Sequence, residues 1–322
     1  MSAERIHDKP LSPDERDWYI IERLRKATEP LSGELLSAEL GMSRVALWKR
    51  IESLKAWGYG IEASRKGYRL DRDDGLAGWE IDAPGPVLLF DTVGSTMDEA
   101  CLLAAGGAVS GATVLALGQS AGRGLGGRPW VSPAGGLYIS VVLRSALPPA
   151  SAGALSLEAS AITLRVLNEA GVASLEFRWP NDIVLAGASG SRPSKVGGVL
   201  VEPHGDLGHA AFYIVGIGLS TAPLELADSA ASARRASLAA AIVAPLVDWA
   251  DEPVLDAARW AWMAPTGSPA GETGARVVLW NGTERRLVPL GFGNHGELIP
   301  ADGGQPVSIG ECRAIYFEGE SL

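Results

Sequence analysis

The segment Gln119–Pro133, QSAGRGLGGRPWVSP, decides how the middle of the chain is interpreted, because its glycines and prolines exclude a regular helix or strand. Glycine-rich backbone allows several N–H groups to converge on an anion. Arg123 and Arg128, five residues apart, add charge-assisted hydrogen bonds. The segment lacks the Lys-Ser/Thr ending of a P-loop and the glycine spacing of a dinucleotide fold. It therefore predicts a different kind of phosphate-binding loop; glycine content alone leaves a flexible surface loop as the alternative.

Strand and helix patterns alternate on both sides of this loop. Apolar β-type runs occur at 87–90, 112–117, 137–143, 196–201 and 212–217, and helical periodicity occurs at 97–105 and 155–170. The central part of the chain is therefore predicted to be an α+β domain.

Three further motifs bring polar groups to the same part of the chain. Ser95 and Thr96 follow a strand at a helix start, where hydroxyls cap the helix or bind a small ligand. The turn 178–182, RWPND, presents an amide and a carboxylate. Lys195 begins an apolar strand; a lysine at the start of a strand is usually exposed to solvent. Gly216-Ile217-Gly218 closes the last strand, where glycine weakens a sheet unless something must approach its backbone.

The N-terminal seventy residues predict a helix-turn-helix with a hairpin wing. The first helix is expected to begin after a cap at Ser12 and to end at about residue 28. The second is expected over 34–40 and ends at Gly41, and the third begins after a cap at Ser43. A hairpin is expected at 61–70. Between positions 16 and 70 there are eleven Lys or Arg and seven Asp or Glu residues, a net charge of +4, which leaves −14 for the remainder. This asymmetry favours a DNA-binding module, with a solvated helical bundle as the alternative. The residues predicted to contact DNA are Ser43, Arg44, Lys49, Arg50 and Lys66.

The composition limits which classes of protein the chain can belong to. The 322 residues are 47% apolar, enough for two or three domains with cores of their own. No stretch approaches the roughly 18 apolar residues of a spanning helix, and the first twenty residues are polar, so the protein is expected in the cytoplasm. Cys101 and Cys312 lack metal-type spacing and are predicted to be buried thiols.

Taken in order, the GRG loop with its following GR-W, the WPND turn and the K-GG-LVE strand resemble the catalytic domain of biotin protein ligases. SGELLSAELGMSRVALWKRIESLKAWGY followed by RKGYRL resembles the winged-helix domain of bifunctional biotin ligase/repressors, so the resemblance covers nearly the whole chain. It implies an α+β protein of three domains. These are a winged helix-turn-helix over 1–72, a ligase-type catalytic domain with a mixed sheet over 80–265, and an SH3-like β-barrel over 272–322.

The resemblance also implies a site. Biotin would be bound by Ser95, Thr96, Met97, Gln119, Gly122, Arg123, Gly124, Leu125, Lys195 and Gly198. ATP would be bound by Arg128, Trp130 and Asn181, with Asp182 orienting Mg²⁺. Lys195, Arg123 and Asp182 would be the catalytic residues.

The implied activity is ATP-dependent formation of biotinyl-5'-AMP and transfer of biotin to a lysine of the biotin carboxyl carrier protein of acetyl-CoA carboxylase. Biotin-responsive repression at operator DNA is implied as well, with dimerisation for DNA binding and no membrane partner.

The chain departs from the family pattern at three places. Leu125 stands where the family's GRGR loop has its second arginine, Met97 replaces the asparagine of Ser-Thr-Asn, and Leu219 follows the glycine strand where asparagine is usual. Loss of a cation at Leu125 leaves open a biotin-sensing DNA-binding regulator with weak or lost ligase activity. A second alternative, a lipoate ligase-like enzyme, is open because lipoate ligases resemble biotin ligases in their catalytic fold.

Overall fold

The computed structural model describes residues 15–172, 174–186, 193–206, 209–220, 234–263 and 274–317. Three expectations lie outside these ranges: the helix cap at 12–14, most of the loop expected between 186 and 194, and the linker expected between 264 and 273. None of the helices in the described ranges combines the length and apolar character needed to cross a membrane.

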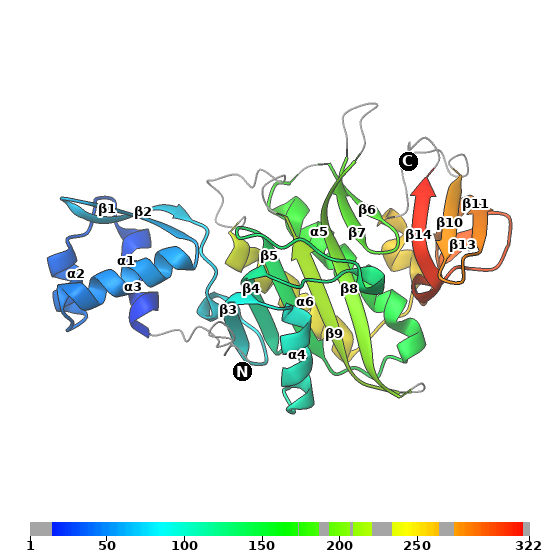
Figure 1. Cartoon of the computed structure of the whole chain (residues 1–322), viewed down its shortest axis with the longest axis horizontal. Helices are drawn as coiled ribbons and strands as arrows, with labels where there is room; N and C mark the ends of the chain where they lie inside the picture. The colour runs from blue at the N-terminus through cyan, green and yellow to red at the C-terminus, as the bar shows by residue number, and fades with distance from the viewer. Residues whose placement is uncertain are drawn as a thin grey trace, which may run out of the picture.

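The N-terminal part is a winged helix-turn-helix, at the left of Figure 1. It consists of α1 Glu15–Lys26, α2 Gly33–Glu39, α3 Arg44–Ala56, and an antiparallel hairpin of β1 Tyr59–Ser64 and β2 Gly67–Asp73. Gly41 ends the second helix with φ of +60°, a conformation that glycine adopts without strain. Ser43 caps α3 as predicted, because its hydroxyl accepts from Ala46 N at 3.2 Å.

The central part contains a seven-stranded mixed sheet in the order β3-β4-β5-β9-β8-β7-β6. β3 and β4 are parallel, and all other neighbours are antiparallel. The strands are β3 Val87–Val93, β4 Thr113–Gln119, β5 Leu137–Leu143, β6 Leu175–Arg178, β7 Asp182–Leu185, β8 Ser194–Asp206 and β9 His209–Leu219. The helices are α4 Thr96–Ala105, α5 Ala152–Glu169 and α6 Arg235–Asp251, with short 3-10 turns η1 Gly78–Glu80, η2 Leu125–Gly127, η3 Pro149–Ser151 and η6 Ala257–Met263.

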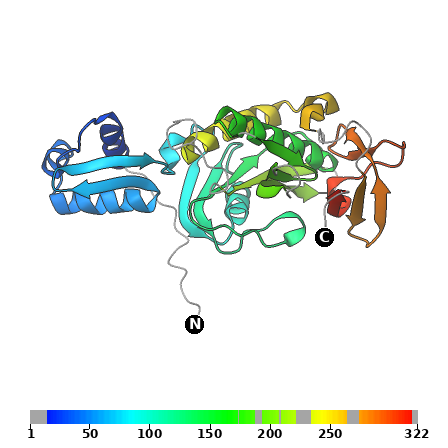
Figure 2. The ribbon, with the colours of Figure 1, turned by 90° about the horizontal axis from the view of Figure 1, so that it is seen from above.

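The sheet is covered on both faces, as its strand sequences require. Side chains of a strand alternate between faces, and here Leu115 and Ile139 join the core under α5 and α6, whereas Val114 and Val142 join the core under α4. Figure 2 shows α5 and α6 together on one side of the sheet, with α4 on the other. The glycine-rich loop leaves the sheet at the end of β4, beside the first turn of α4.

The C-terminal part is small and built of β-strands, as expected. One sheet has the order β11-β10-β14 and another pairs β12 with β13. The strands are β10 Ala275–Leu279, β11 Glu284–Leu287, β12 Pro289–Phe292, β13 Leu298–Pro300 and β14 Cys312–Phe317, with η7 Ile309–Glu311 before the last. The thiol of Cys312 is buried, and burial raises its pKa to about 11, whereas Cys101 is only partly buried.

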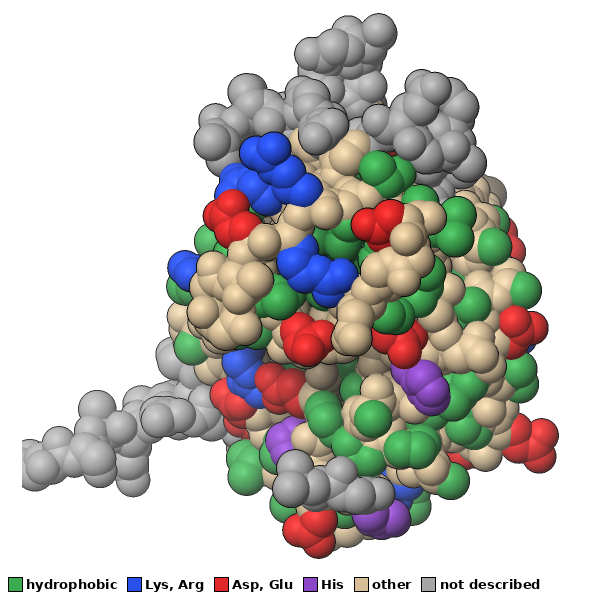
Figure 3. Space-filling model, turned by 90° about the vertical axis from the view of Figure 1, so that its right-hand side faces the viewer, with side chains coloured by type: hydrophobic (Ala, Val, Ile, Leu, Met, Phe, Trp, Pro, Cys, Tyr) green, Lys and Arg blue, Asp and Glu red, His purple; other side chains and the backbone are tan. Residues whose placement is uncertain are grey.

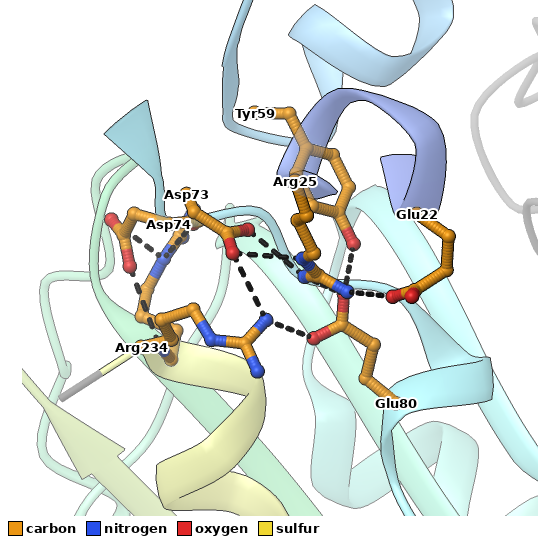
Figure 4. A network of polar contacts seen from close by, with 8 residues as sticks. Glu22, Arg25, Tyr59, Asp73, Asp74, Glu80 and Arg234 are labelled. Atoms are coloured by element: carbon orange, nitrogen blue, oxygen red, sulfur yellow. Dashed lines mark hydrogen bonds and ion pairs between the residues drawn. The ribbon is translucent and has the colours of Figure 1, made fainter. Parts of the chain in front are cut away.

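A network of ion pairs joins the winged helix to the catalytic part (Figure 4). Glu80, in η1, accepts from Arg25 of α1 at 2.6 Å, from Tyr59 OH at 2.6 Å and from Arg234 at 2.8 Å. Asp73 of the wing also accepts from Arg25, at 2.8 Å. Burial lowers the pKa of Arg25, but hydrogen bonds to Asp73 and Glu80 outweigh it, so the net shift is upward. The two parts are therefore connected by paired charges as well as by the chain.

Candidate functional site

The predicted ligand-binding residues surround one cavity of about 230 Å³ between the glycine-rich loop, α4 and strands β5, β8 and β9. The predicted residues that line it are Ser95, Thr96, Met97, Gln119, Arg123, Gly124, Leu125, Arg128, Trp130, Asn181, Lys195 and Gly198. The other two, Gly122 and Asp182, do not line the cavity but contact residues that do. Gly122 has room for no side chain, since a Cβ would lie 2.7 Å from Trp130 O, and Asp182 is ion-paired with Lys195.

The glycine-rich loop is an ordered, narrow hairpin. Gln119 pairs with Ser132 and Arg123 with Pro129 in isolated antiparallel bridges. At the tip, Gly124 N donates to Arg128 O at 2.7 Å, and the loop turns through Gly126 and Gly127, whose φ values are +67° and +73°. Left-handed backbone at two consecutive positions explains the local glycine content.

A linear chain of hydrogen bonds runs from Ser140 through Thr96 and Gln119 to Ser132 at one end of the cavity. Gln119 Oε1 accepts from Thr96 N at 2.8 Å and from Thr96 Oγ1 at 3.0 Å, and Gln119 Nε2 donates to Ser132 Oγ at 2.8 Å. Ser140 Oγ, on β5, donates to Thr96 Oγ1 at 2.8 Å. Thr96 and Ser140 are buried, so this chain fixes the orientation of Thr96 and Gln119, which line the cavity.

Arg123 is held by carboxylates. It donates to both oxygens of Glu202, at 3.0 and 2.9 Å, to Asp98 Oδ1 at 2.5 Å and to Ser95 Oγ at 3.2 Å. The hydrogen bonds to Glu202 raise the pKa of Arg123, and burial opposes the shift. In this conformation the guanidinium connects the loop to β8 and α4. Its positive charge is already paired with the carboxylates of Glu202 and Asp98.

Lys195 occupies the opposite wall. Its ammonium lies 2.6 Å from Asp182 Oδ1 and 4.8 Å from the centroid of the Trp130 ring, a cation–π contact. The Lys195 side chain remains 44% exposed, so the cation is accessible from the cavity. Trp130 can lie across the sheet because Gly218 has no side chain: a Cβ there would approach Trp130 Nε1 to 2.7 Å. Among the described residues, no acceptor meets this buried indole N–H.

Asn181 holds the RWPND turn against β8. Its amide nitrogen donates to Val199 O at 2.9 Å, and Val199 N donates back to Asn181 O at 2.9 Å. Asn181 was expected to bind ATP; here its side-chain nitrogen is engaged with the strand, and the residue positions its neighbour Asp182.

Several residues of the site were not predicted from the sequence. Glu202 and Asp98 fix Arg123, and Ser132 and Ser140 complete the hydrogen-bonded chain around Thr96. Two of them carry a usable signal. Ser140 interrupts the apolar run Leu137–Leu143, and Glu202 ends the apolar part of the strand that starts at Lys195. A buried polar residue in an apolar strand needs a partner, and here the partner belongs to the site.

Beside the cavity, Asp182 supplies a carboxylate that could contribute to a divalent-cation site. In the described part of the chain, no group of three or more His, Cys, Asp and Glu side chains is arranged to hold a metal ion. Mg²⁺ is commonly bound by one or two carboxylates together with substrate phosphates. Asp182 fits that pattern as a single protein ligand, provided that a nucleotide supplies the others.

The residues predicted to contact DNA divide into two groups. Arg44 and Lys49 on α3 and Lys66 at the wing turn are exposed. Arg50 was expected to face outward with them, but it turns inward to Asp17 of α1 at 3.0 Å, because that buried carboxylate needs a cation. At the other end of the molecule, basic and acidic side chains of the described residues are intermixed (Figure 3).

Comparisons with known proteins match the N-terminal and the central parts of the chain to two different families. The family model of the HTH domain matches residues 16–69, and that of the Biotin/lipoate A/B protein ligase family matches residues 94–220. The chain is 34% identical over 226 residues to the bifunctional ligase/repressor BirA of Bacillus spizizenii, a match that covers 65% of this chain and 68% of the relative. It is 35% identical over 205 residues to that of Escherichia coli, covering 62% and 61%. A biotin protein ligase from Aquifex aeolicus, solved with biotin and ATP, shares the fold with a TM-score of 0.52 at 20% identity, covering 71% of this chain and 98% of that one.

Proposed function

This chain belongs to the family of bifunctional biotin ligase/repressors, and from that premise we propose that it activates biotin with ATP, transfers it to an acceptor protein and binds operator DNA. The observation that carries the proposal is that polar residues from separate segments of the chain meet at one cavity. The three-domain division over 1–72, 80–265 and 272–322 is part of the same proposal.

The chemistry requires no protein nucleophile. An oxygen of the biotin carboxylate attacks the α-phosphorus of ATP, pyrophosphate leaves, and a lysine amine of the acceptor then attacks the acyl carbon and displaces AMP. Both steps depend on orientation and on neutralising oxygen charge. The acceptor that we propose is the biotin carboxyl carrier protein of acetyl-CoA carboxylase.

Each wall of the cavity has a proposed role. The hydrogen-bonded chain around Thr96 and Gln119 binds the polar ring of biotin, while Met97 and Gly198 border its apolar part. Lys195 neutralises the carboxylate and the α-phosphate where they meet, as its accessible ammonium permits. Trp130, whose ring lies beside Lys195, borders the proposed adenylate; its indole N–H has no acceptor among the described residues and, because it is buried, would become a donor to an adenylate oxygen only after the ring shifts.

Arg123 and Asp182 act through their neighbours in the conformation described. Arg123 fixes the loop, and for it to meet a phosphate directly, one of its bonds to Glu202 and Asp98 must be exchanged. Asp182 holds Lys195 and is the protein ligand that we propose for Mg²⁺, which would neutralise phosphate charge when bound with ATP. Arg128 and Asn181 border the proposed nucleotide position.

The winged helix is the proposed DNA-binding part, with Arg44, Lys49 and Lys66 as phosphate or base contacts and Ser43 at the helix start. Repression in response to biotin would couple it to the cavity, with two chains binding one operator. Because ATP and DNA are its proposed partners, we place the protein in the cytoplasm.

Transfer tests the proposal. The purified chain, with biotin and ATP, is expected to add one biotin to a biotin carboxyl carrier domain, measured as an increase in its intact mass. A carrier whose acceptor lysine is replaced by arginine should gain no mass. Transfer of lipoate in place of biotin would support the lipoate ligase alternative, and biotin binding without any transfer would support the sensor alternative.

A further inference from the structure

Trp280, in the C-terminal part, lies on the tip of the glycine-rich loop. A Cβ added to Gly126 would overlap Cη2 and Cζ2 of the Trp280 indole, so the ring lies directly against the Gly126 backbone. Gly126 is therefore glycine for two reasons, its φ of +67° and this contact. The two residues are 154 positions apart in the chain, and their contact joins the loop to the end of β10.

Hydrogen bonds hold Trp280 and the C-terminal part in place. Trp280 follows β10, and its backbone N–H donates to Glu311 O at 3.1 Å. The C-terminal part is in turn fastened to the catalytic part: Trp179 Nε1 donates to Gly296 O at 3.1 Å, and Ser151 Oγ lies 2.7 Å from His295 Nδ1. The ring that contacts Gly126 is therefore anchored, through the C-terminal part, to the catalytic part.

The charges of the loop differ in how far they are matched. Arg123 is paired with Glu202 and Asp98 and Leu125 carries no charge, whereas Arg128 is exposed and donates its Nε to Leu125 O at 3.1 Å. Gly124, Leu125 and Arg128 form one wall of the cavity. The position of the loop therefore decides where this wall and the Arg128 cation lie relative to a bound molecule.

We propose that Trp280 is a positioning residue that keeps the loop closed over the acyl-adenylate until the acceptor amine arrives. The proposal rests on the proposed function. An acyl-adenylate that escapes is lost, because water adds to the acyl carbon, the bond from that carbon to the bridging oxygen breaks, and AMP leaves with the free carboxylic acid as the other product. Trp280 limits this loss by holding Gly126 and hence the wall that the loop contributes.

The test measures release of the intermediate from the full-length protein. Radiolabelled biotinyl-adenylate is formed on the protein from biotin and ATP with pyrophosphatase present, and its release is followed after a chase with unlabelled biotin. Trp280→Ala is expected to speed release about tenfold, which corresponds to about 1.4 kcal/mol of lost contact energy for this half-exposed indole, while the maximal rate of pyrophosphate exchange changes less than about twofold. Trp280→Phe should restore most of the retention.

Two matched variants sharpen the test. Gly126→Ala disturbs the same contact from the loop side, and combining it with Trp280→Ala should release the intermediate no faster than the faster single variant. Trp262→Ala removes another tryptophan that is 46% exposed and, like Trp280, lies outside the cavity lining; because it follows α6 and not β10, it should behave as the parent does. Release from Trp280→Ala at the parental rate would overturn the proposal.

A second measurement keeps this inference separate from the proposed function. Hydrogen exchange in the loop peptide 120–131 of the ligand-free protein should rise in Trp280→Ala and stay at the parental level in Trp262→Ala. If the parent forms no adenylate but exchange in the loop rises as expected, the proposed function fails and the positioning of the loop by Trp280 stands. Unchanged exchange in Trp280→Ala would contradict the positioning role itself.

Discussion

The ammonium of Lys195 lies between Asp182 Oδ1, at 2.6 Å, and the face of the Trp130 ring, 4.8 Å from its centroid. One cation thus connects the RWPND turn of the sheet with the glycine-rich loop. Since the side chain is also 44% exposed, Lys195 is both fixed in place and accessible to a ligand. These are the properties expected of a group that neutralises charge developing on a bound substrate.

Thr96→Val should weaken biotin binding. The substitution keeps the volume but removes the hydroxyl between Ser140 Oγ and Gln119 Oε1, and a buried polar group left without its partner costs about 1–3 kcal/mol. Isothermal titration calorimetry with biotin measures the loss. Ser120→Ala, whose hydroxyl only approaches Val93 O, is the control and should bind as the parent does.

Leu125→Arg should slow the escape of the acyl-adenylate. Leu125 lines the cavity from the loop, and arginine there would add a charge-assisted hydrogen bond to phosphate, worth about 1.5–3 kcal/mol. The chase experiment with labelled biotin measures it, with Leu125→Met as the control of similar volume. Equal release from the arginine and methionine variants would show that charge at this position has no part in retention.

Glu80→Ala should destabilise the junction between the winged helix and the catalytic part. The Glu80 side chain is 7% exposed and joins Arg25, Tyr59 and Arg234 (Figure 4). Its removal should lower the free energy of unfolding by roughly 2–3 kcal/mol, less than the roughly 3–5 kcal/mol of a fully buried pair, because both arginines are partly exposed. Urea unfolding measures this change. Glu62→Ala removes an exposed partner of Arg69 and should cost less than about 1 kcal/mol.

Substitutions in the winged helix should distinguish residues that contact DNA from residues that stabilise the fold. Arg44→Ala and Lys49→Ala should each reduce the slope of log affinity against log salt by about one, since each removes one phosphate contact. Arg50→Ala should instead lower the melting temperature, because it leaves the buried Asp17 carboxylate without this ion pair. Fluorescence anisotropy with operator DNA and thermal unfolding distinguish the two effects. A parental melting temperature in Arg50→Ala would contradict this assignment.

The sequence predicted the elements that carry strong local signals. Ser43 capped its helix as expected, and the apolar runs 87–90, 112–117 and 137–143 became neighbouring strands. Helix α6 was not predicted, because Pro245 in its middle normally argues against a helix interior. Strand β8 continues to Asp206, beyond the expected 196–201, because its long pairing with β9 compensates for weak β-propensity near Pro203 and Gly205.

The site could not be predicted completely because its ion pairs join residues that are far apart in the sequence. The residues of the cavity follow from motifs, but the partners of its charges do not. Glu202 lies 79 residues after Arg123 in the chain, and Arg50 finds Asp17 33 residues before it. No local pattern connects such pairs, because the fold alone brings them together. The contact between Trp280 and Gly126 is of the same kind.

Biotin-dependent exchange of pyrophosphate into ATP tests the central claim most directly, because it measures formation of the adenylate without an acceptor. The parent is expected to catalyse exchange with biotin and not with lipoate. Lys195→Ala should lower the rate at least about a hundredfold while remaining folded. Lys55→Ala, which alters a lysine paired with Glu52 on the winged helix, is the control and should exchange as the parent does. Full exchange by folded Lys195→Ala, or no exchange by the parent despite tight biotin binding, would contradict the account.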